Sequence, residues 1–421
     1  MNDMKAVILA AGKSSRFYPY NYFPHKSLIK ILGKPIIVHT IESVKRSGIK
    51  NIILIVSKNS EIKKILGNGK NLGVSIQYVV QKEPTGGGNG LLLAEKLIDG
   101  DFFLLNASRV DFSEYEELMS SKKSKNDKGV LLAKRQENLQ KYGALRVDKD
   151  RVIDLVEKPK KGEEPSNLRL IGIYLFTKDF LKTLRQTPDE HYRLEKAISS
   201  FSKINPVKFV ETENEVPSLK YSWDLLGIKN YLFKNIKKSI GKNVKIAKSA
   251  EIIGNVIIED GAEIMEGSKI KGPCFIGKNT MIGNNAILRS NADIEENCTI
   301  GAYMEVKNSL IMSGTKVHSG FIGDSVIGGN CRIGAQFSSA NVRLDRSEIK
   351  IQTEKEEVDS GLKHLGAMVG RNVKIGIKVS TMPGVMIGQN SIVGPSTVVL
   401  QNVPENSKYY TKFKETVIKN G

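Results

Sequence analysis

The sequence predicts a Rossmann-like α/β domain followed by a parallel β-helix, and two patterns in its 421 residues carry this prediction. In the first half, short apolar runs alternate with helical patterns, which is typical of a mostly parallel sheet with helices on both faces. After about residue 240 the helical signal ends and an aliphatic residue recurs at every sixth position, which indicates hexapeptide coils. We therefore expect an α/β domain over 1–230, a linker helix over 231–240, a β-helix over 241–405 and a tail over 406–421.

The first predicted strand is the apolar run KAVILA at residues 5–10, whose lack of polar alternation indicates burial on both faces. A helix should follow over 36–47 and end at Gly48, since glycine readily adopts the left-handed conformation that closes a helix. Three further strands are expected at NIILIVSK, IQYVV and DFFLLNA, and a glycine-rich turn should open a helix over 86–98.

The six-residue period runs unbroken from Ile246 to Val306, with a mostly small residue two places before each aliphatic. It slips near Met312 and resumes, but the polar segment 341–364 breaks it and should loop out of the coils. Loops that interrupt a solenoid often carry its functional site. The sequence contains three cysteines and no CxxC pair, and all three occupy the small inward position, so we expect core packing and neither a disulfide nor a zinc site: Cys274, Cys298 and Cys331.

The composition favours anionic partners, because 64 lysines and arginines against 45 acidic residues give a net charge of +19. Nucleotides, sugar phosphates, nucleic acid and anionic membranes all satisfy this charge. No apolar stretch approaches the roughly 18 to 20 residues that cross a bilayer, and the opening residues lack a basic segment before their apolar run. We therefore expect a cytoplasmic protein without a membrane partner.

The loop LAAGKSSRFYP follows the first strand, and the carboxyl end of such a strand is where doubly wound sheets bind nucleotides. Backbone N–H groups of residues 12–15 could surround phosphate oxygens, and Arg16 could bind the charge with two hydrogen bonds. Taken alone, a Gly/Ser loop is more often a simple turn. It matches neither GxGxxG nor the Walker pattern, which argues against NAD binding and ordinary ATPase chemistry.

Further segments in the same order make the pattern specific: PHKSLIKILGKPII, QKEPTGGGNGLLLAE, KYGALRV, LVEKPKK, SNLRLIGIYLF and YSWDLL. Together with the loop they resemble the sugar-1-phosphate nucleotidylyltransferase family. The coils resemble the acyltransferase domain of its bifunctional members, including archaeal ones. This resemblance implies a left-handed β-helix and homo-trimers whose sites lie between neighbouring subunits.

By resemblance, Arg16 and Lys26 hold the triphosphate and stabilise charge on the α-phosphate while the sugar phosphate attacks it and pyrophosphate leaves. The other positions implied for the nucleotide lie in the loop and in the segment QKEPTGGG, where glycine lets the backbone approach a flat base: Gly12, Ser14, Ser15, Gln81 and Gly86.

The resemblance also implies a sugar pocket, with Glu157 accepting hydroxyl hydrogen bonds and Lys158 facing the sugar phosphate. Asp224 would bind Mg²⁺, a hard cation that prefers carboxylate and phosphate oxygens. The implied sugar-binding set is Gly143, Glu157, Lys158 and Asn167.

The chain departs from the family pattern at several of these positions. Ser14 and Ser15 replace a glycine and a threonine, and Leu170 replaces a sugar-binding asparagine. Ser108 replaces a metal-binding aspartate, and a hydroxyl is a poor ligand for Mg²⁺. Asp111 is only three residues away but should point elsewhere, so Mg²⁺ would rest on Asp224, phosphates and water.

A second site is implied by KVHSGFIGDSVIGG and GAQFSSANVRLD, which resemble the acetyltransferase site of the bifunctional enzymes. His318 would take the proton from a sugar amine as the amine attacks acetyl-CoA, and its ordinary pKa near 6.5 suits a general base. Asn341 would hold the acceptor and Lys350 would face its phosphate. Two family groups are changed, because Phe321 and Ser347 replace a tyrosine and a lysine.

These observations predict an enzyme that condenses UTP or dTTP with a hexose or amino-sugar 1-phosphate, with a second, acetyl-CoA-dependent activity. The changed positions leave open a catalytically impaired subunit that binds nucleotide sugars. Nucleic-acid binding rests on charge alone, because no recognised motif accompanies the basic, aromatic-containing tail. We expect that tail to pack on the end of the β-helix.

Overall fold

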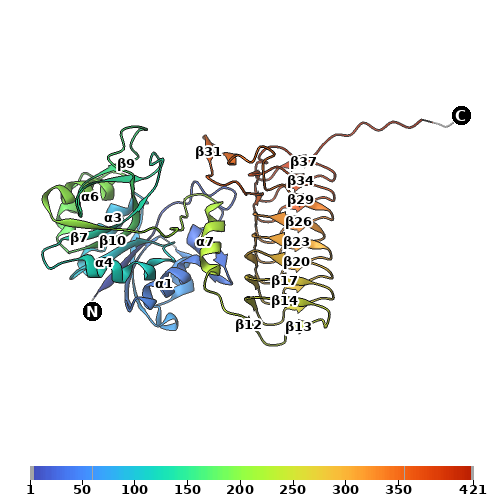
Figure 1. Ribbon diagram of the computed structural model, residues 1–421, viewed down its shortest axis with the longest axis horizontal. Coiled ribbons are helices and arrows are strands. Elements are labelled where there is room, and N and C mark those ends of the chain that lie inside the picture. Colours follow the sequence, from blue (N-terminus) through green and yellow to red (C-terminus); the bar gives the residue numbers. More distant parts are fainter. Residues whose placement is uncertain (1–3, 59, 355, 419–421) are drawn as a thin grey trace. The chain divides into compact units, whose positions relative to one another are not determined.

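The computed structural model describes residues 4–58, 60–354 and 356–418 (Figure 1), and the chain divides into two compact units. The first unit contains the chain up to Ser14, together with Pro24–Ile29 and Pro35–Pro217. The second contains Ser15–Phe23 and Lys30–Lys34, together with the chain from Ser218 onward. The contact boundary thus lies near 217 where the sequence suggested 230, and two early segments belong to the later unit.

The first unit is built on a sheet with the strand order β5-β4-β1-β6-β10-β7-β11-β9-β8. The strands expected from the sequence, β1, β4, β5 and β6, are parallel, whereas β10 is antiparallel to both β6 and β7. The strands are β1 (Lys5–Ala10), β4 (Asn51–Ser57), β5 (Ser75–Gln81), β6 (Phe102–Asn106), β7 (Gly129–Arg135), β8 (Gly143–Asp148), β9 (Arg151–Glu157), β10 (Leu168–Phe176) and β11 (Val207–Glu211).

Helices cover both faces of this sheet (Figure 1). Val7 of β1 packs in one core cluster with α3, α5 and α6, while its neighbours Ala6 and Ile8 are fully buried on the opposite face. The apolar run of β1 is therefore buried on both faces, as predicted. The helices of this unit are α1 (Ile36–Arg46), α2 (Glu61–Leu66), α3 (Gly87–Leu93), α4 (Glu116–Lys122), α5 (Phe180–Gln186) and α6 (Arg193–Ile204), with 3-10 turns η1 (Lys26–Leu28), η2 (Lys70–Leu72), η3 (Glu95–Leu97) and η4 (Phe112–Glu114).

The second unit is a three-sided parallel β-helix of hexapeptide coils, as its repeat predicts. Each coil contributes one short strand to each of three parallel sheets (Figure 1). Side one contains β12 (Ser239–Ile240), β15 (Val256–Ile258), β18 (Cys274–Ile276), β21 (Ala292–Ile294), β24 (Leu310–Ile311), β27 (Val326–Ile327), β32 (Met368–Val369) and β35 (Met386–Ile387).

The other two sides follow the same arrangement. Side two contains β13 (Lys245–Ile246), β16 (Glu263–Ile264), β19 (Met281–Ile282), β22 (Thr299–Ile300), β25 (Lys316–Val317), β28 (Arg332–Ile333), β33 (Lys374–Ile375), β36 (Ile392–Val393) and β38 (Lys408–Tyr409). Side three contains β14 (Glu251–Ile253), β17 (Lys269–Lys271), β20 (Ile287–Arg289), β23 (Met304–Lys307), β26 (Gly320–Gly323), β29 (Phe337–Ser339), β34 (Ser380–Thr381) and β37 (Val398–Val399).

The residues of the six-residue period fill the interior of these coils. Ile276, Ile282 and Leu288 stack in one continuous core cluster and are fully buried. The three cysteines lie in the same cluster as free thiols, and burial raises the pKa of each to about 12. Their predicted role as core residues is confirmed.

The outer row of side one is buried as well, although it points away from the core. Residues paired along it in register include Phe275, Asp293, Leu310 and Val326, and each is at most 1% exposed. Segments of the same unit cover them: the Leu32 backbone N–H donates to Asp293 Oδ2 (3.0 Å), and the Tyr20 hydroxyl donates to the Val326 carbonyl (2.6 Å).

Three details differ from or refine the expectations. The sequence predicts a linker helix over 231–240, but the helix before the coils, α7 (Asp224–Phe233), ends at Phe233. The first strand of the coils, β12, already begins at Ser239. The segment 341–364 does loop out, and it contains a hairpin of β30 (Lys350–Gln352) and β31 (Glu357–Asp359). The tail packs on the coils through β38 and through the backbone N–H groups of Asn406, Ser407 and Thr411, which donate to Gln389, Ser391 and Thr397. Residues 412–418 are exposed, so the packing expectation was wrong for this part of the tail.

Within the described ranges, no helix has both the length and the apolar character that crossing a bilayer requires.

The inward stacking predicts the effect of truncating one aliphatic side chain. Leu288→Ala should destabilise the second unit by about 2 to 5 kcal/mol, because Leu288 is fully buried and its removal leaves a cavity. Denaturant unfolding followed by fluorescence of Trp223, the single tryptophan and a buried residue of this unit, measures the change. Lys316→Ala, at an exposed outward position, serves as the control and should shift stability by less than about 0.5 kcal/mol. Equal stability of both variants would contradict the inward placement.

Candidate active site

The loop after β1 lies at the position in the sheet where the chain changes direction. The chain runs from β1 outward through β4 to β5 and then crosses back to β6 on the other side of β1. In open α/β sheets this switch point, at the carboxyl ends of the strands, is where ligands bind. Gly12 and Ser14 follow β1 directly, and Gly12 is exposed there. The loop predicted to bind phosphate is thus at the favoured edge of the sheet.

Lys26 is held near this loop by its own backbone. The Lys26 N–H donates to the Ser14 hydroxyl (3.1 Å), which brings two predicted nucleotide-binding residues together within the first unit. His25 lies directly before Lys26 and caps η1 by accepting the Ser27 N–H at Nδ1 (3.2 Å). Burial lowers the pKa of His25 to about 4, so this cap is a neutral imidazole at physiological pH.

Gln81 and Gly86, the residues predicted to contact the base, are joined to each other. Gln81 ends β5, is 6% exposed, and its Nε2 donates to the Gly86 carbonyl (3.0 Å). Gly86 has a φ of 117°, and an added Cβ would lie 2.7 Å from the His191 carbonyl oxygen. Only glycine fits this position, which caps the start of α3.

The predicted sugar-binding residues collect at one end of the β8–β9 hairpin. Gly143 pairs with Glu157, and an added Cβ on Gly143 would lie 3.1 Å from Glu157 Oε2. The carboxylate therefore lies over the glycine. Lys158 follows β9, and its Nζ donates to the Tyr192 hydroxyl (2.5 Å). Asn167 precedes β10, and its Oδ1 accepts from Arg135 Nη1 (3.1 Å).

The start of α6 connects these two groups and adds a carboxyl that the sequence reasoning missed. His191 contacts Gly86, and Tyr192 binds Lys158, so residues 191–195 reach both the base and the sugar positions. Glu195 lies close enough to Glu157 for the negative charge of Glu157 to act on it. Burial, with Glu157 contributing, raises the pKa of Glu195 to about 7. No motif in the sequence marks Glu195, because only folding brings α6 against the end of β9.

Three predicted residues belong to the second unit by their contacts. Ser15 and Arg16 lie in the segment Ser15–Phe23, and both are exposed. Asp224 is the first residue of α7, and its Oδ2 accepts the backbone N–H groups of Lys220 (2.5 Å) and Tyr221 (2.8 Å). Asp224 therefore fixes the turn that opens its helix.

Asp111 does not replace the missing metal-binding aspartate. It is fully buried and forms a two-point ion pair with Arg109, with Nε–Oδ1 at 3.0 Å and Nη2–Oδ2 at 2.8 Å. Burial raises the pKa of Asp111 although Arg109 opposes this. Ser108 precedes the pair, and no cluster of three metal-ligating side chains occurs in the portion of the chain that the structure describes. The expectation that Asp111 points elsewhere agrees with this pairing.

His318 lies at a corner of the β-helix, directly after β25, and its side chain is exposed. Its backbone N–H donates to the Ile333 carbonyl of the next coil (3.0 Å). Gly320, two residues on, has a φ of 126°, and an added Cβ would lie 2.0 Å from the Phe337 carbonyl oxygen. Glycine therefore lets adjacent coils approach closely beside the histidine. Phe321 is half-buried on the outer row of side three.

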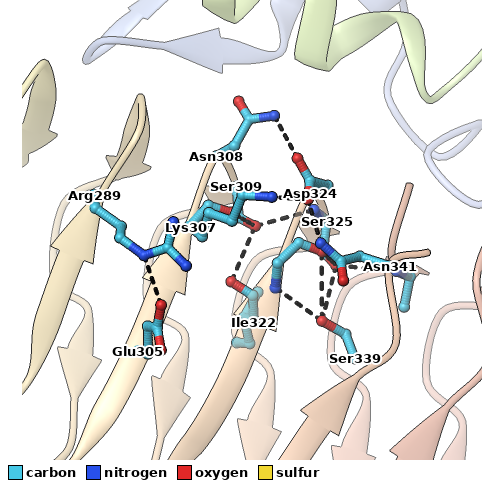
Figure 2. A network of polar contacts seen from close by, with 12 residues as sticks. Arg289, Glu305, Lys307, Asn308, Ser309, Ile322, Asp324, Ser325, Ser339 and Asn341 are labelled. Atoms are coloured by element: carbon cyan, nitrogen blue, oxygen red, sulfur yellow. Dashed lines mark hydrogen bonds and ion pairs between the residues drawn. The ribbon is translucent and has the colours of Figure 1, made fainter. Parts of the chain in front are cut away.

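Asn341 follows β29 and donates its amide N–H to Asp324 Oδ2 (Figure 2). Lys350 lies in the hairpin β30–β31, where Nζ is 3.3 Å from Glu357 Oε1, and both side chains are largely exposed. Ser347, which replaces a family lysine, instead donates to Asp345 Oδ1 (2.8 Å). The structure thus ties Asn341 to the coils and leaves Lys350 in the loop.

The raised pKa of Glu195 predicts a pH-dependent stability. The folded state holds the proton up to about pH 7 while the unfolded chain releases it near 4.5, so stability falls as pH rises through this window. Glu195→Gln removes that loss, and its stability relative to the wild type should increase by about 2 to 3 kcal/mol between pH 5 and pH 8. Urea unfolding followed by helical circular dichroism measures it. A pH-independent difference would show that Glu195 ionises normally.

Models of three protein families match successive parts of the chain. The nucleotidyl transferase family matches residues 5–238, more than half of the chain. The GMPPB C-terminal domain matches residues 270–355, and the bacterial transferase hexapeptide, with six repeats, matches residues 366–401. The order of these matches follows the order of the two predicted domains.

Relatives from archaea match over nearly the whole length. The bifunctional protein GlmU of Methanococcus aeolicus is 35% identical, with 99% of both chains covered, and that of Methanocaldococcus jannaschii is 34% identical, with 97% of this chain and 98% of the relative covered. A bifunctional sugar-1-phosphate nucleotidylyltransferase/acetyltransferase of Sulfurisphaera tokodaii is 33% identical, covering 95% and 98%. The chain therefore belongs to the nucleotidyl transferase family of enzymes, in the group whose members continue into a hexapeptide β-helix.

Proposed function

We propose that the chain condenses a nucleoside triphosphate with a sugar 1-phosphate. A phosphate oxygen of the sugar phosphate attacks the α-phosphorus, the bond from that phosphorus to the bridging oxygen breaks, and pyrophosphate leaves. Little covalent chemistry is asked of the protein, so positioning and charge stabilisation account for the rate. The observation that carries the proposal is the Ser14–Lys26 contact at the switch point of the sheet, combined with family membership.

The neighbouring groups support the two substrates. Gln81 and Gly86 provide an amide and an open backbone for a base, while Glu157 and Lys158 provide a carboxylate and a cation for a sugar and its phosphate. The names of the relatives are consistent with this substrate pair. UTP or dTTP as the nucleotide, and a hexose or amino-sugar 1-phosphate as the acceptor, remain the predictions made from the sequence.

Asp224 is the residue that we propose as the protein ligand of Mg²⁺. The ion commonly binds one or two carboxylates together with substrate phosphates, and it would neutralise charge on the triphosphate. Asp224 already accepts two backbone N–H groups at Oδ2, which holds its carboxylate in one orientation. Asp111 is excluded from this role by its ion pair with Arg109.

We further propose that the β-helix acetylates a sugar amine with acetyl-CoA. His318 takes a proton as the amine nitrogen attacks the thioester carbonyl, the carbon–sulfur bond breaks, and the departing sulfur receives that proton, so that CoA leaves as the thiol. The exposed corner position of His318 and the ordered side chain of Asn341 support this assignment. A trimer in the cytoplasm remains the expectation for the active assembly.

A subunit that binds nucleotide sugars without turnover is the alternative, and Ser108 is the observation that favours it, because the Asp111 carboxylate three residues on is paired with Arg109 and does not replace the lost metal ligand. Incubation with Mg²⁺, each triphosphate and a panel of sugar 1-phosphates distinguishes the two. Pyrophosphate release supports the enzyme, whereas binding of nucleotide sugars without release from any pair would support the alternative.

Lys26→Ala should lower the rate of pyrophosphate release by about a hundredfold, the typical cost of removing one charge-stabilising group from a transition state. Lys50→Ala is the matched control, because Lys50 is exposed and precedes β4 at the opposite, amino end of the parallel strands. Its rate should equal that of the wild type. Equal rates for both variants would remove Lys26 from the reaction.

His318→Ala should reduce acetyl transfer by about 10² to 10⁴-fold, as expected when a general base is lost. The measurement is release of free CoA thiol from acetyl-CoA in the presence of glucosamine 1-phosphate. His364→Ala, at another exposed histidine of the same unit, should retain full activity. Full activity of His318→Ala would show that another group takes the proton.

A further inference from the structure

A chain of hydrogen bonds within the second unit runs from α7 to Asn341. Lys229 on α7 donates to Asn308 Oδ1 (2.9 Å), and Asn308 Nδ2 donates to Asp324 Oδ1 (2.7 Å). Asp324 Oδ2 in turn accepts from the amide of Asn341. Figure 2 shows Asn308 and Asn341 converging on Asp324 from neighbouring coils.

The first link fixes the orientation of Asn308. Lys229 is fully buried, and its three N–H groups go to Asn308 Oδ1, Asn230 Oδ1 (2.9 Å) and the Asn291 carbonyl (2.6 Å). An ammonium group only donates hydrogen bonds, so Asn308 must turn its amide oxygen toward Lys229. Its NH₂ group then points to Asp324.

The second link fixes the orientation of Asn341 in the same way. Asp324 is 2% exposed and accepts from Asn308, from Lys307 Nζ (2.9 Å) and from Asn341. The donors Lys307 and Asn308 favour the ionised form of this carboxylate, which can only accept hydrogen bonds. Asn341 therefore turns its NH₂ group inward to Asp324 and presents its oxygen on the other side.

We propose that Lys229, Asn308 and Asp324 are positioning residues that make Asn341 an obligate acceptor, so that its amide oxygen receives an N–H of the acetyl-accepting amine. This inference rests on the proposed acetyl transfer. An amide that could rotate freely would offer either a donor or an acceptor, whereas a fixed amide oxygen selects a ligand with a donor at that point. The chain of contacts thus sets acceptor specificity from α7, which touches no substrate in this scheme.

Kinetics of CoA release by Lys229→Met and Asp324→Asn test the proposal. Asp324→Asn frees the Asn341 amide directly, whereas Lys229→Met frees the Asn308 amide, whose oxygen can then turn toward the Asp324 carboxylate and repel it from its contact with Asn341. Each variant should raise KM for glucosamine 1-phosphate about three- to tenfold, the loss of one hydrogen bond, while KM for acetyl-CoA stays constant. Because both changes break one chain, the double variant should show less than the product of the two single effects.

Arg289→Met is the matched control. Arg289 also carries a cation on the coils shown in Figure 2, but it pairs with Glu305 (2.6 Å) and takes no part in the chain to Asn341. Its KM values should equal those of the wild type. Unfolding followed by Trp223 fluorescence shows whether each variant is folded, and the isosteric Asp324→Asn keeps the test informative if Lys229→Met is unstable.

The outcomes separate this inference from the function on which it depends. Wild-type release of CoA together with unchanged KM values in the variants, or equal rises in KM for both substrates, would overturn the inference and leave acetyl transfer intact. An absence of CoA release by the wild type would overturn acetyl transfer and the inference with it. A rise confined to the amine substrate supports both.

Discussion

The outer row of side one of the β-helix is the constraint on which the second unit depends. A solenoid side that faces water needs polar residues on its outer row, and side two has them, with Lys316, Arg332 and Lys374 paired in register. Side one instead presents residues such as Phe275 and Leu310, which would expose a continuous apolar surface. The segments Ser15–Phe23 and Lys30–Lys34 belong to the second unit because they cover this row.

Buried carboxyl groups define how these covering segments sit on the coils. Asp293 and Glu295 each accept one backbone N–H, from Leu32 and Gly33 (3.0 Å each), while burial raises both pKa values, that of Asp293 to about 7. Lys229 provides the compensating cation, and burial lowers its pKa. Apolar contacts alone would tolerate a shift of the segment along the row. The hydrogen bonds to Asp293 and Glu295 oppose such a shift, because it would leave these buried carboxyl groups without their backbone N–H partners.

The sequence was sufficient to predict each architecture but not the exchange of segments between them. Strands such as β1 and the inward stack ending at Val306 follow from local periodicity, which one short stretch of chain can reveal. That Ser15 and Arg16 belong with the coils depends on contacts between residues about 300 positions apart, such as Tyr20 with Val326. The sequence carried only part of this signal: Ile257 and Phe275, 18 residues apart on the outer row of side one, are apolar, but the next residue of the row is Asp293.

The candidate site residues also fall into two groups: those that a local sequence motif marks, and those whose surroundings form only when distant elements pack together. Gly86 could be recognised because the close approach of the His191 backbone leaves no alternative to glycine, and this requirement is visible in a motif. Glu195, Lys229 and Asn308 could not, because their surroundings are formed by elements distant in sequence and their residue types are common at surfaces. A lysine on a helix is ordinarily solvated. Lys229 differs only because Asn230, Asn291 and Asn308 together satisfy its three N–H groups, and a set of acceptors from three places in the chain exists only after folding.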